Sequence, residues 1–244
     1  MKHIDLNCDV GEGLNNENEL FPLISSCSIA CGGHAGDQKT MNKVIGLALQ
    51  NEVKIGAHPS YPDRKNFGRI SLNLPKSDFI KSIRSQLTVF SKILREHGGS
   101  LNHIKPHGAL YNDLAKDKTL SVHFLEAIAP YKDGVKLYVP YGSVIAEEAQ
   151  KLDWELYYEA FGDRNYEDDL SLVSRKQANA LIQEPLRVME HIMTIINESK
   201  VKTISGQLIP IVAETFCLHG DTPNVLQILM YLSREFPKKN ILIK

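Results

Sequence analysis

Short apolar runs alternate with longer amphipathic stretches along the chain. The runs predict strands at 4–6, 28–30, 53–57, 102–105, 135–139, 155–158 and near 216–218, with a short eighth strand at 241–243. Between them, the sequence predicts helices at 39–51, 76–97, 106–129, 143–152, 177–184, 186–199 and 223–236. In the second of these helices, apolar residues recur at helical spacing from Phe79 to Leu94, and Gly98 ends the helix.

This alternation predicts a parallel sheet with helices packed outside it. Seven or eight strand–helix units in 244 residues favour an irregular α/β fold, a closed or nearly closed (β/α) barrel forming a single domain over residues 1–244. A doubly wound open sheet is the alternative. The long loop at 60–73 carries charged residues and is a candidate functional segment.

The composition of the chain argues against several classes of function. Lys and Arg number 28 and Asp and Glu 29, so the net charge of −1 argues against a nucleic-acid binder. The sequence has no apolar run of eighteen residues, and its N-terminus does not resemble a signal peptide, so we expect a cytoplasmic protein without membrane contact. The four cysteines form no C-x-x-C pair and are expected to be buried, reduced thiols.

Ionisable residues beside Gly or Pro follow six of the predicted strands. In a parallel barrel the carboxyl ends of all strands lie on one face, so these segments should converge on one pocket, as in an enzyme. The candidates are Asp9, His34, His58, Lys105, His107, Asp163, Arg164, His219 and Asp221.

Two kinds of chemistry fit this set. Asp5 or Asp9, together with His34 and His58, could hold a divalent metal that activates water. Without a metal, a His or Asp would act as general base while Lys105 or Arg164 holds an anion. No G-x-S-x-G elbow and no P-loop motif is present, and Gly11-Glu12-Gly13 is too short and acidic for a phosphate cradle.

The same segments resemble the LamB/YcsF family of 5-oxoprolinase A subunits over nearly the whole chain. The matching stretches are DLNCDVGEG at 5–13, ACGGHAGD at 30–37, GAHPSYPD at 56–63, FGR at 67–69, KPHGALYN at 105–112, DRNY at 163–166 and HGDTP at 219–223. Two positions depart from the family pattern: Leu170 stands where a Gly is usual, and Ser28 where an Asn is usual.

The resemblance implies a barrel related to those of polysaccharide deacetylases. It implies the reaction of ATP, 5-oxo-L-proline and two waters to L-glutamate, ADP and phosphate, carried out with two further subunits, B and C. ATP would be the co-substrate of the complex, with Mg²⁺ or another divalent metal as a candidate cofactor, and a homo-oligomer is compatible with it.

The matched segments also suggest roles. Asp9, His34 or His58 would activate water, and Lys105, Arg164 or Arg69 would bind the substrate carboxylate or phosphate. His107, Asp163, His219 and Asp221 would complete or orient the site, and the substrate-binding set comprises Asn7, Asp63, Arg69 and Tyr111. Two alternatives stay open: a stand-alone metal-dependent amidohydrolase or carbohydrate deacetylase, and a non-catalytic subunit of a lactam-processing complex.

Overall fold

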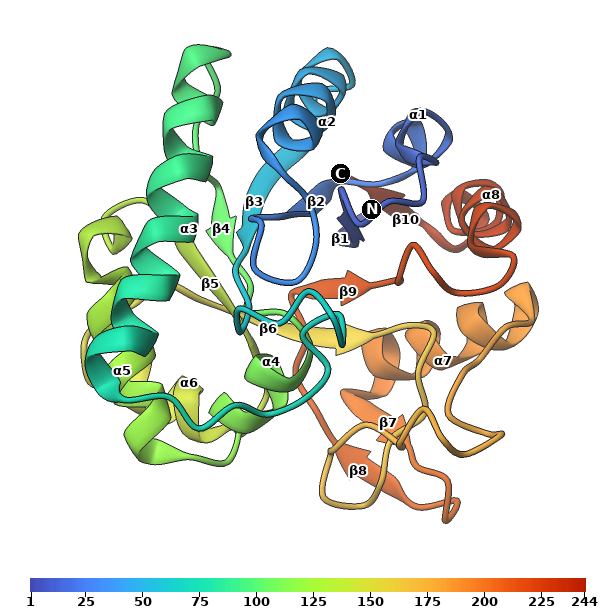
Figure 1. Cartoon of the computed structure of the whole chain (residues 1–244). Coiled ribbons are helices and arrows are strands. Elements are labelled where there is room, and N and C mark those ends of the chain that lie inside the picture. Colours follow the sequence, from blue (N-terminus) through green and yellow to red (C-terminus); the bar gives the residue numbers. More distant parts are fainter.

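A barrel of seven parallel strands forms the centre of the protein, in a computed structural model that describes residues 1–244 (Figure 1). The strands pair in the order β1-β2-β3-β4-β5-β6-β9, and β9 pairs again with β1 to close the ring. Their bounds are β1 (Lys2–Val10), β2 (Ser26–Ala30), β3 (Lys54–His58), β4 (His103–Ile104), β5 (Lys136–Pro140), β6 (Leu156–Phe161) and β9 (Thr215–Cys217). The predicted barrel is therefore confirmed, and the open sheet is excluded.

The eighth predicted strand is β10 (Ile241–Ile243), which lies outside the ring and pairs in parallel with the first residues of β1. Lys2 pairs with Ile241, and the backbone N–H of Lys2 donates to the carbonyl of Asn240. This pairing brings the two ends of the chain side by side, as Figure 1 shows.

Helices surround the barrel and cover the outer faces of its strands (Figure 1). Side chains cap three of them, as Ser143 does at the start of α6, where its Oγ accepts from the N–H of Ala146. The bounds are α1 (Glu17–Leu20), α2 (Gln38–Gln50), α3 (Lys76–Glu96), α4 (Gly108–Leu114), α5 (Lys118–Ile128), α6 (Val144–Gln150), α7 (Pro185–Glu198) and α8 (Val225–Glu235).

The prediction of a helix at 177–184 is wrong. These residues form turns, and Leu181 makes an isolated antiparallel bridge to Arg164. Tertiary contacts to Arg164 override the helical preference of the local sequence here. A small antiparallel hairpin, β7 (Lys200–Lys202) with β8 (Leu208–Pro210), follows α7 and was not predicted as a pair.

The core is one cluster of buried apolar side chains that joins the barrel to its helices. From Ile4 onward every residue of β1 is buried, as expected for a strand enclosed on both sides. All four cysteines are buried and unpaired, which confirms the prediction of reduced thiols. No helix is long and apolar enough to span a membrane.

Candidate active site

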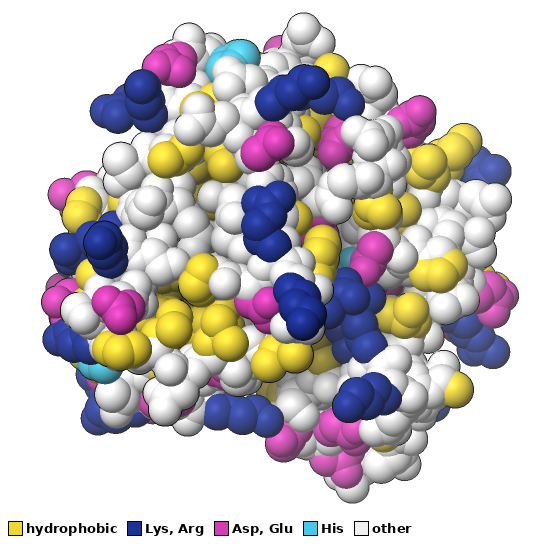
Figure 2. Space-filling model, viewed as in Figure 1, with side chains coloured by type: hydrophobic (Ala, Val, Ile, Leu, Met, Phe, Trp, Pro, Cys, Tyr) yellow, Lys and Arg dark blue, Asp and Glu magenta, His cyan; other side chains and the backbone are white.

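A pocket of about 590 Å³ opens at the carboxyl ends of the barrel strands. Figure 2 shows this face, where Lys and Arg side chains gather around a hollow near the centre. The strand ends therefore converge as the sequence predicted. Among the predicted residues, those that line the pocket are Asp9, His58, Arg69, Lys105, His107, Tyr111, Arg164, His219 and Asp221.

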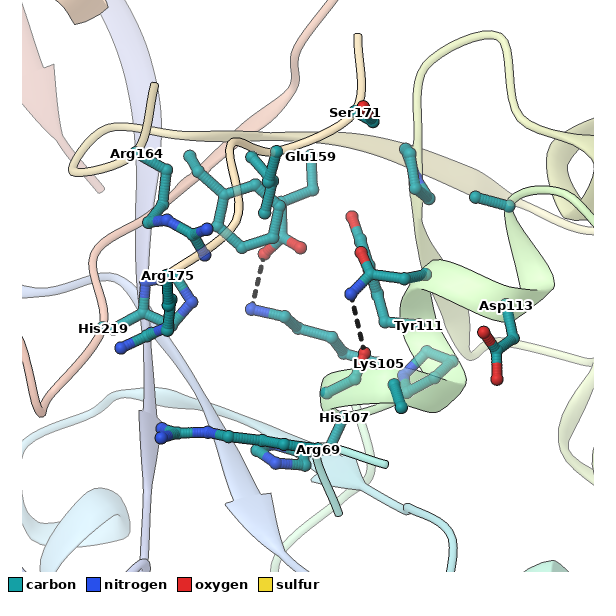
Figure 3. Close-up of a pocket in the computed structure, with 18 of the residues that line it drawn as sticks. Arg69, Lys105, His107, Tyr111, Asp113, Glu159, Arg164, Ser171, Arg175 and His219 are labelled. Carbon is teal, nitrogen blue, oxygen red and sulfur yellow. Dashed lines mark hydrogen bonds and ion pairs between the residues drawn. The ribbon is translucent and has the colours of Figure 1, made fainter. Parts of the chain in front are cut away.

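Lys105 occupies the centre of the pocket floor, directly after β4, and its side chain is 2% exposed. Its Nζ lies 2.8 Å from Glu159 Oε1 and 3.0 Å from Asp9 Oδ1, and Figure 3 shows the first of these ion pairs. It also donates to Asn7 Oδ1 at 3.3 Å and to Cys217 Sγ at 3.1 Å. Burial alone lowers the pKa of this ammonium, but Asp9, Cys217 and Glu159 outweigh it and raise the pKa. Lys105 is therefore a fixed positive charge.

Two buried polar atoms near Lys105 form no well-aligned hydrogen bond within the protein. They are Glu159 Oε2 and the hydroxyl of Tyr111, and both residues line the pocket. Leaving such groups unpaired costs about 1–3 kcal/mol each, so they are the natural contacts of a ligand. Burial, and next the charge of Glu159, raise the pKa of Tyr111 well above its usual value, so this hydroxyl keeps its proton to donate.

Three histidines and a glutamate form a second cluster beside Lys105. Glu12 Oε1 lies 2.8 Å from His34 Nε2, 3.3 Å from His107 Nδ1 and 3.9 Å from His58 Nε2. Glu12, His34 and His107 follow β1, β2 and β4, and His58 is the last residue of β3. Burial lowers the pKa of His34 to about 3 and also lowers the pKa of His107, so both rings are neutral near pH 7. These residues, and a second group of Asp9, Cys217 and His219, have the donor atoms to hold a metal ion.

Asp163 and His219 form another pair at the site, with Asp163 fully buried and His219 partly exposed. Asp163 Oδ1 lies 3.0 Å from His219 Nδ1, and its Oδ2 accepts from the backbone N–H of His219 and the hydroxyl of Thr222. Burial alone raises the pKa of Asp163, but the charge and hydrogen bonds of His219 and Thr222 outweigh it and lower the pKa. The carboxylate fixes the ring of His219, with Nε2 as the nitrogen left for a ligand.

The rim of the pocket carries a cluster of opposite charges. Asp221 binds Arg69 at 2.7 Å and Arg175 at 3.2 Å. Arg69 also lies over the ring of Phe67, 4.9 Å from its centroid. Both guanidinium groups are partly exposed and have donors left for a carboxylate or phosphate.

Arg164 lines the pocket, and part of its hydrogen-bonding capacity is used within the protein. Its Nη2 donates to the carbonyl of Val173 at 2.6 Å and its Nε to that of Ala180 at 3.4 Å. These two bonds connect the guanidinium group to backbone carbonyls of the loop 164–181. It therefore holds one wall of the pocket in place (Figure 3).

The structure does not bring every predicted residue into the pocket. Asp5 binds Ser26, Thr215 and Lys54 and lies apart from the histidine cluster, which corrects its place among the metal ligands. Asp63 accepts from Asn66 in the loop after β3 and does not line the pocket.

Asn7, His34 and Asp163 lie behind the pocket wall, where each contacts residues that line it. Asn7 accepts a hydrogen bond from Lys105 and donates one to Glu159. None of the three reaches the cavity itself.

Sequence reasoning missed three residues of the site: Glu12, Glu159 and Arg175. Glu159 follows Tyr158 near the end of a predicted strand, and its position there was the available signal. Glu12 was considered only as part of a phosphate loop. Arg175 lies in a segment without periodicity, which gives no signal.

A sequence profile of the LamB/YcsF family matches residues 4–244. The chain belongs to this family. The A subunit of 5-oxoprolinase from Haemophilus influenzae, in strains PittEE and 86-028NP, is 38% identical to this LamB/YcsF chain over 243 residues, covering 100% of the chain and 99% of the relative. The resemblance seen in the sequence is thus confirmed.

Solved structures agree with this membership. The lactam utilization protein from Thermus thermophilus superposes with a TM-score of 0.90 and 30% identity, covering 100% of this chain and 99% of that one. A family 4 carbohydrate esterase from Streptomyces lividans, in complex with acetate, has a TM-score of 0.51 and 8% identity, covering 98% and 90% of the two chains. The second likeness shows that the LamB/YcsF barrel shares a fold with that esterase, and nothing about its reaction.

The two departures from the LamB/YcsF pattern have visible consequences. Leu170 has a φ of +64°, a left-handed conformation that the usual Gly adopts without strain. Ser28 Oγ lies 3.1 Å from His103 Nε2, beneath the pocket. Neither change removes a charged group from the site.

Proposed function

We propose that this chain is the A subunit of an ATP-dependent 5-oxoprolinase, an enzyme that hydrolyses the lactam of 5-oxo-L-proline to L-glutamate. Its full-length similarity to the A subunit of the Haemophilus 5-oxoprolinase supports the substrate. The observation that carries the proposal is the pocket floor, where the buried ammonium of Lys105 lies between Asp9 and Glu159 and beside unpaired polar atoms.

These unpaired atoms complement a lactam. Glu159 Oε2 accepts a hydrogen bond, and a lactam offers one N–H donor. The hydroxyl of Tyr111 and the ammonium of Lys105 are donors for the lactam carbonyl. Arg69 and Arg175 at the rim would bind the carboxylate of 5-oxoproline. A five-membered ring with one carboxylate thus meets a partner for each of its polar groups.

The reaction needs an activated carbonyl because an amide is a poor electrophile. In the proposed sequence, the lactam oxygen receives the phosphoryl group of ATP within the complex. Water then adds to the ring carbon, the C–N bond breaks, and the nitrogen takes a proton to become the amine of glutamate. A second water hydrolyses the resulting acyl phosphate, which accounts for both waters and for the released phosphate.

The position of each side chain in the pocket suggests its role in this reaction. His219, oriented by Asp163, would take the proton from water and return it to the leaving nitrogen. Lys105 stabilises negative charge that develops at the carbonyl oxygen, and Asp9 holds Lys105 in place. A divalent cation held by the histidine cluster would supply Lewis acidity and lower the pKa of a bound water.

The direct test is glutamate release from 5-oxo-L-proline and ATP. It compares the purified chain alone with the chain mixed with its partner subunits, which are expected from the complex that the name of the relatives implies. We expect glutamate and ADP to appear together and only in the complete mixture. Absence of glutamate from an assembled complex would contradict the proposal. Release of acetate from N-acetyl sugars by the chain alone would instead support a deacetylase.

A further inference from the structure

Two histidines of the cluster each turn one ring nitrogen toward the other. His58 Nδ1 lies 2.8 Å from the carbonyl oxygen of Lys105, and His107 Nε2 lies 2.9 Å from that of Phe67. A carbonyl only accepts, so both of these outer nitrogens carry the hydrogen. The inner nitrogens, His58 Nε2 and His107 Nδ1, are therefore the ring atoms left to bind a ligand.

The inner nitrogens lie only 2.9 Å apart, with the Glu12 carboxylate beside them. A proton placed here would bridge two of these three atoms, whereas a metal ion would contact all three. Ligands about 2.0–2.1 Å from a tetrahedral ion lie about 3.3 Å from one another. The separations of 2.9, 3.3 and 3.9 Å among these donors are close to that value.

His34 has a different relation to the cluster. Its ring is stacked on that of His107, with centroids 3.5 Å apart and planes 1° from parallel. An imidazole binds a metal in the plane of its ring, so one ion cannot lie in the planes of both. His34 also does not line the pocket, whereas Glu12, His58 and His107 do. Its Nε2 lies 2.8 Å from Glu12 Oε1, as for a histidine that orients a carboxylate ligand.

In the second group of donor atoms, Asp9 and Cys217 already contact a cation, the ammonium of Lys105. Lys105 Nζ lies 3.0 Å from Asp9 Oδ1 and 3.1 Å from Cys217 Sγ. A metal ion among Asp9, Cys217 and His219 would face this buried ammonium at close range. The Glu12 cluster is thus the better of the two sites.

We propose that Glu12 Oε1, His58 Nε2 and His107 Nδ1 bind one divalent transition-metal ion of the zinc type, with His34 as a positioning residue for Glu12. Two nitrogens and one carboxylate are a donor set of catalytic zinc sites, which keep an open position for water or substrate. The same set is poor for Mg²⁺, which prefers oxygen ligands and retains its waters. The open position faces the pocket, since all three ligands line it.

Binding of the ion stands on these contacts alone, whereas its use in catalysis rests on the proposed lactam hydrolysis. In that reaction the ion would hold the attacking water or the substrate oxygen a short distance from Asp9, whose Oδ2 lies 3.4 Å from His58 Nε2. Metal affinity is measured on the chain without partners or substrate. A failure of the metal site and a failure of the functional proposal are therefore distinguishable.

The test is a titration of the chelator-treated chain with Zn²⁺, Co²⁺ and Mg²⁺ by calorimetry, with the visible absorption of bound Co²⁺ as a second readout. We expect one Zn²⁺ or Co²⁺ per chain and no saturable Mg²⁺ binding. His58→Ala and His107→Ala should each weaken Zn²⁺ binding by more than a hundredfold. His34→Gln should weaken it about 10–100-fold, the usual effect of losing a residue that orients a ligand. Glu12→Gln, a near-isosteric change, serves as a further ligand variant if an alanine variant fails to fold.

His219→Asn is the matched control, because His219 lies in the same pocket but belongs to the other donor group. Its Zn²⁺ affinity should equal that of the wild type. The proposal is overturned if the folded wild-type chain binds no Zn²⁺ or Co²⁺, which would leave a shared proton between the histidines. It is also overturned if His219→Asn abolishes binding while His58→Ala does not.

Discussion

At the scale of single residues, the site depends on buried charges that compensate one another. The ammonium of Lys105 contacts both Asp9 and Glu159 on the pocket floor, and all three side chains are almost fully buried. Such an arrangement contributes little net stability, because desolvation offsets the attraction between the charges. Removal of one partner is costly, since the remaining charges stay buried without compensation.

This reasoning gives a prediction for Lys105→Met. The variant should lose about 3–5 kcal/mol in free energy of unfolding, because two buried carboxylates lose the ammonium that they share. The double variant Lys105→Met/Glu159→Gln should recover part of that loss. Urea denaturation of the single and double variants measures both values. A double variant that is less stable than the sum of its single changes would contradict the account.

A second prediction concerns His103, which lies within the barrel below the pocket. Its ring is fully buried, stacks on Tyr138 at a centroid distance of 3.8 Å, and contacts Ser28. Burial, with a smaller effect of Lys105, holds the pKa of His103 well below its usual value. The unfolded chain therefore binds a proton below about pH 6.5 that the folded chain does not bind.

Protonation of His103 in the unfolded chain thus leaves the free energy of unfolding unchanged above about pH 6.5. As the pH falls below that value, it lowers the free energy of unfolding by up to about 1.4 kcal/mol per pH unit. The variant His103→Gln should show a shallower decline, since Gln does not titrate. The measurement is the free energy of unfolding in urea between pH 7.5 and pH 5 for both proteins, at about half-unit steps. Parallel pH profiles for the two would contradict the assignment.

At the scale of elements, the strands place the site and the loops complete it. The alternation of apolar runs with amphipathic stretches was sufficient to predict the barrel, and the end of each strand predicted Lys105, His58 and His107 at the pocket. Asp5 and Asp9 show the limit of this reasoning. Both lie on β1, but four residues of a strand span about 13 Å, so Asp5 lies far from the carboxyl end.

Loop conformations account for the residues that the sequence did not reveal. Glu12 reaches the histidines only because the chain turns at Gly11, which has a φ of +73°, and Gly13, which has a φ of +93°. The segment 177–184 has helical composition, yet it forms turns held by Arg164. Neither conformation follows from periodicity, because each is fixed by contacts between distant parts of the chain.

Arg164 allows a test at this scale. Arg164→Gln removes its bonds to the carbonyls of Val173 and Ala180, so the loop 164–181 should open more often. We expect faster hydrogen exchange in this loop and a raised KM for 5-oxoproline, with little change in the exchange of α3. Arg187→Gln, at an exposed position on α7, is the matched control. Unchanged exchange in the loop would show that Arg164 does not hold it.

At the scale of the whole molecule, the barrel gathers side chains that are far apart in the sequence. Lys105 contacts Asn7 and Cys217, which lie 98 and 112 residues away. Closure of the ring between β1 and β9 brings Cys217 and His219 beside Asp9. A single pocket can therefore combine a fixed cation, an oriented histidine and a set of metal donors.

The central claim is that this pocket carries out lactam hydrolysis within the complex. The most direct measurement is the rate of glutamate release by complexes reconstituted with wild-type chain, Asp9→Asn or His219→Asn, each checked for folding and assembly. Each variant should lower turnover about a hundredfold or more. His219→Asn removes the proposed acid–base group, whose loss typically costs about 10²–10⁴-fold in rate, and Asp9→Asn removes the carboxylate that holds Lys105 in place. Near-normal glutamate release by both assembled variants would contradict the account and assign the chemistry to one of the partner subunits.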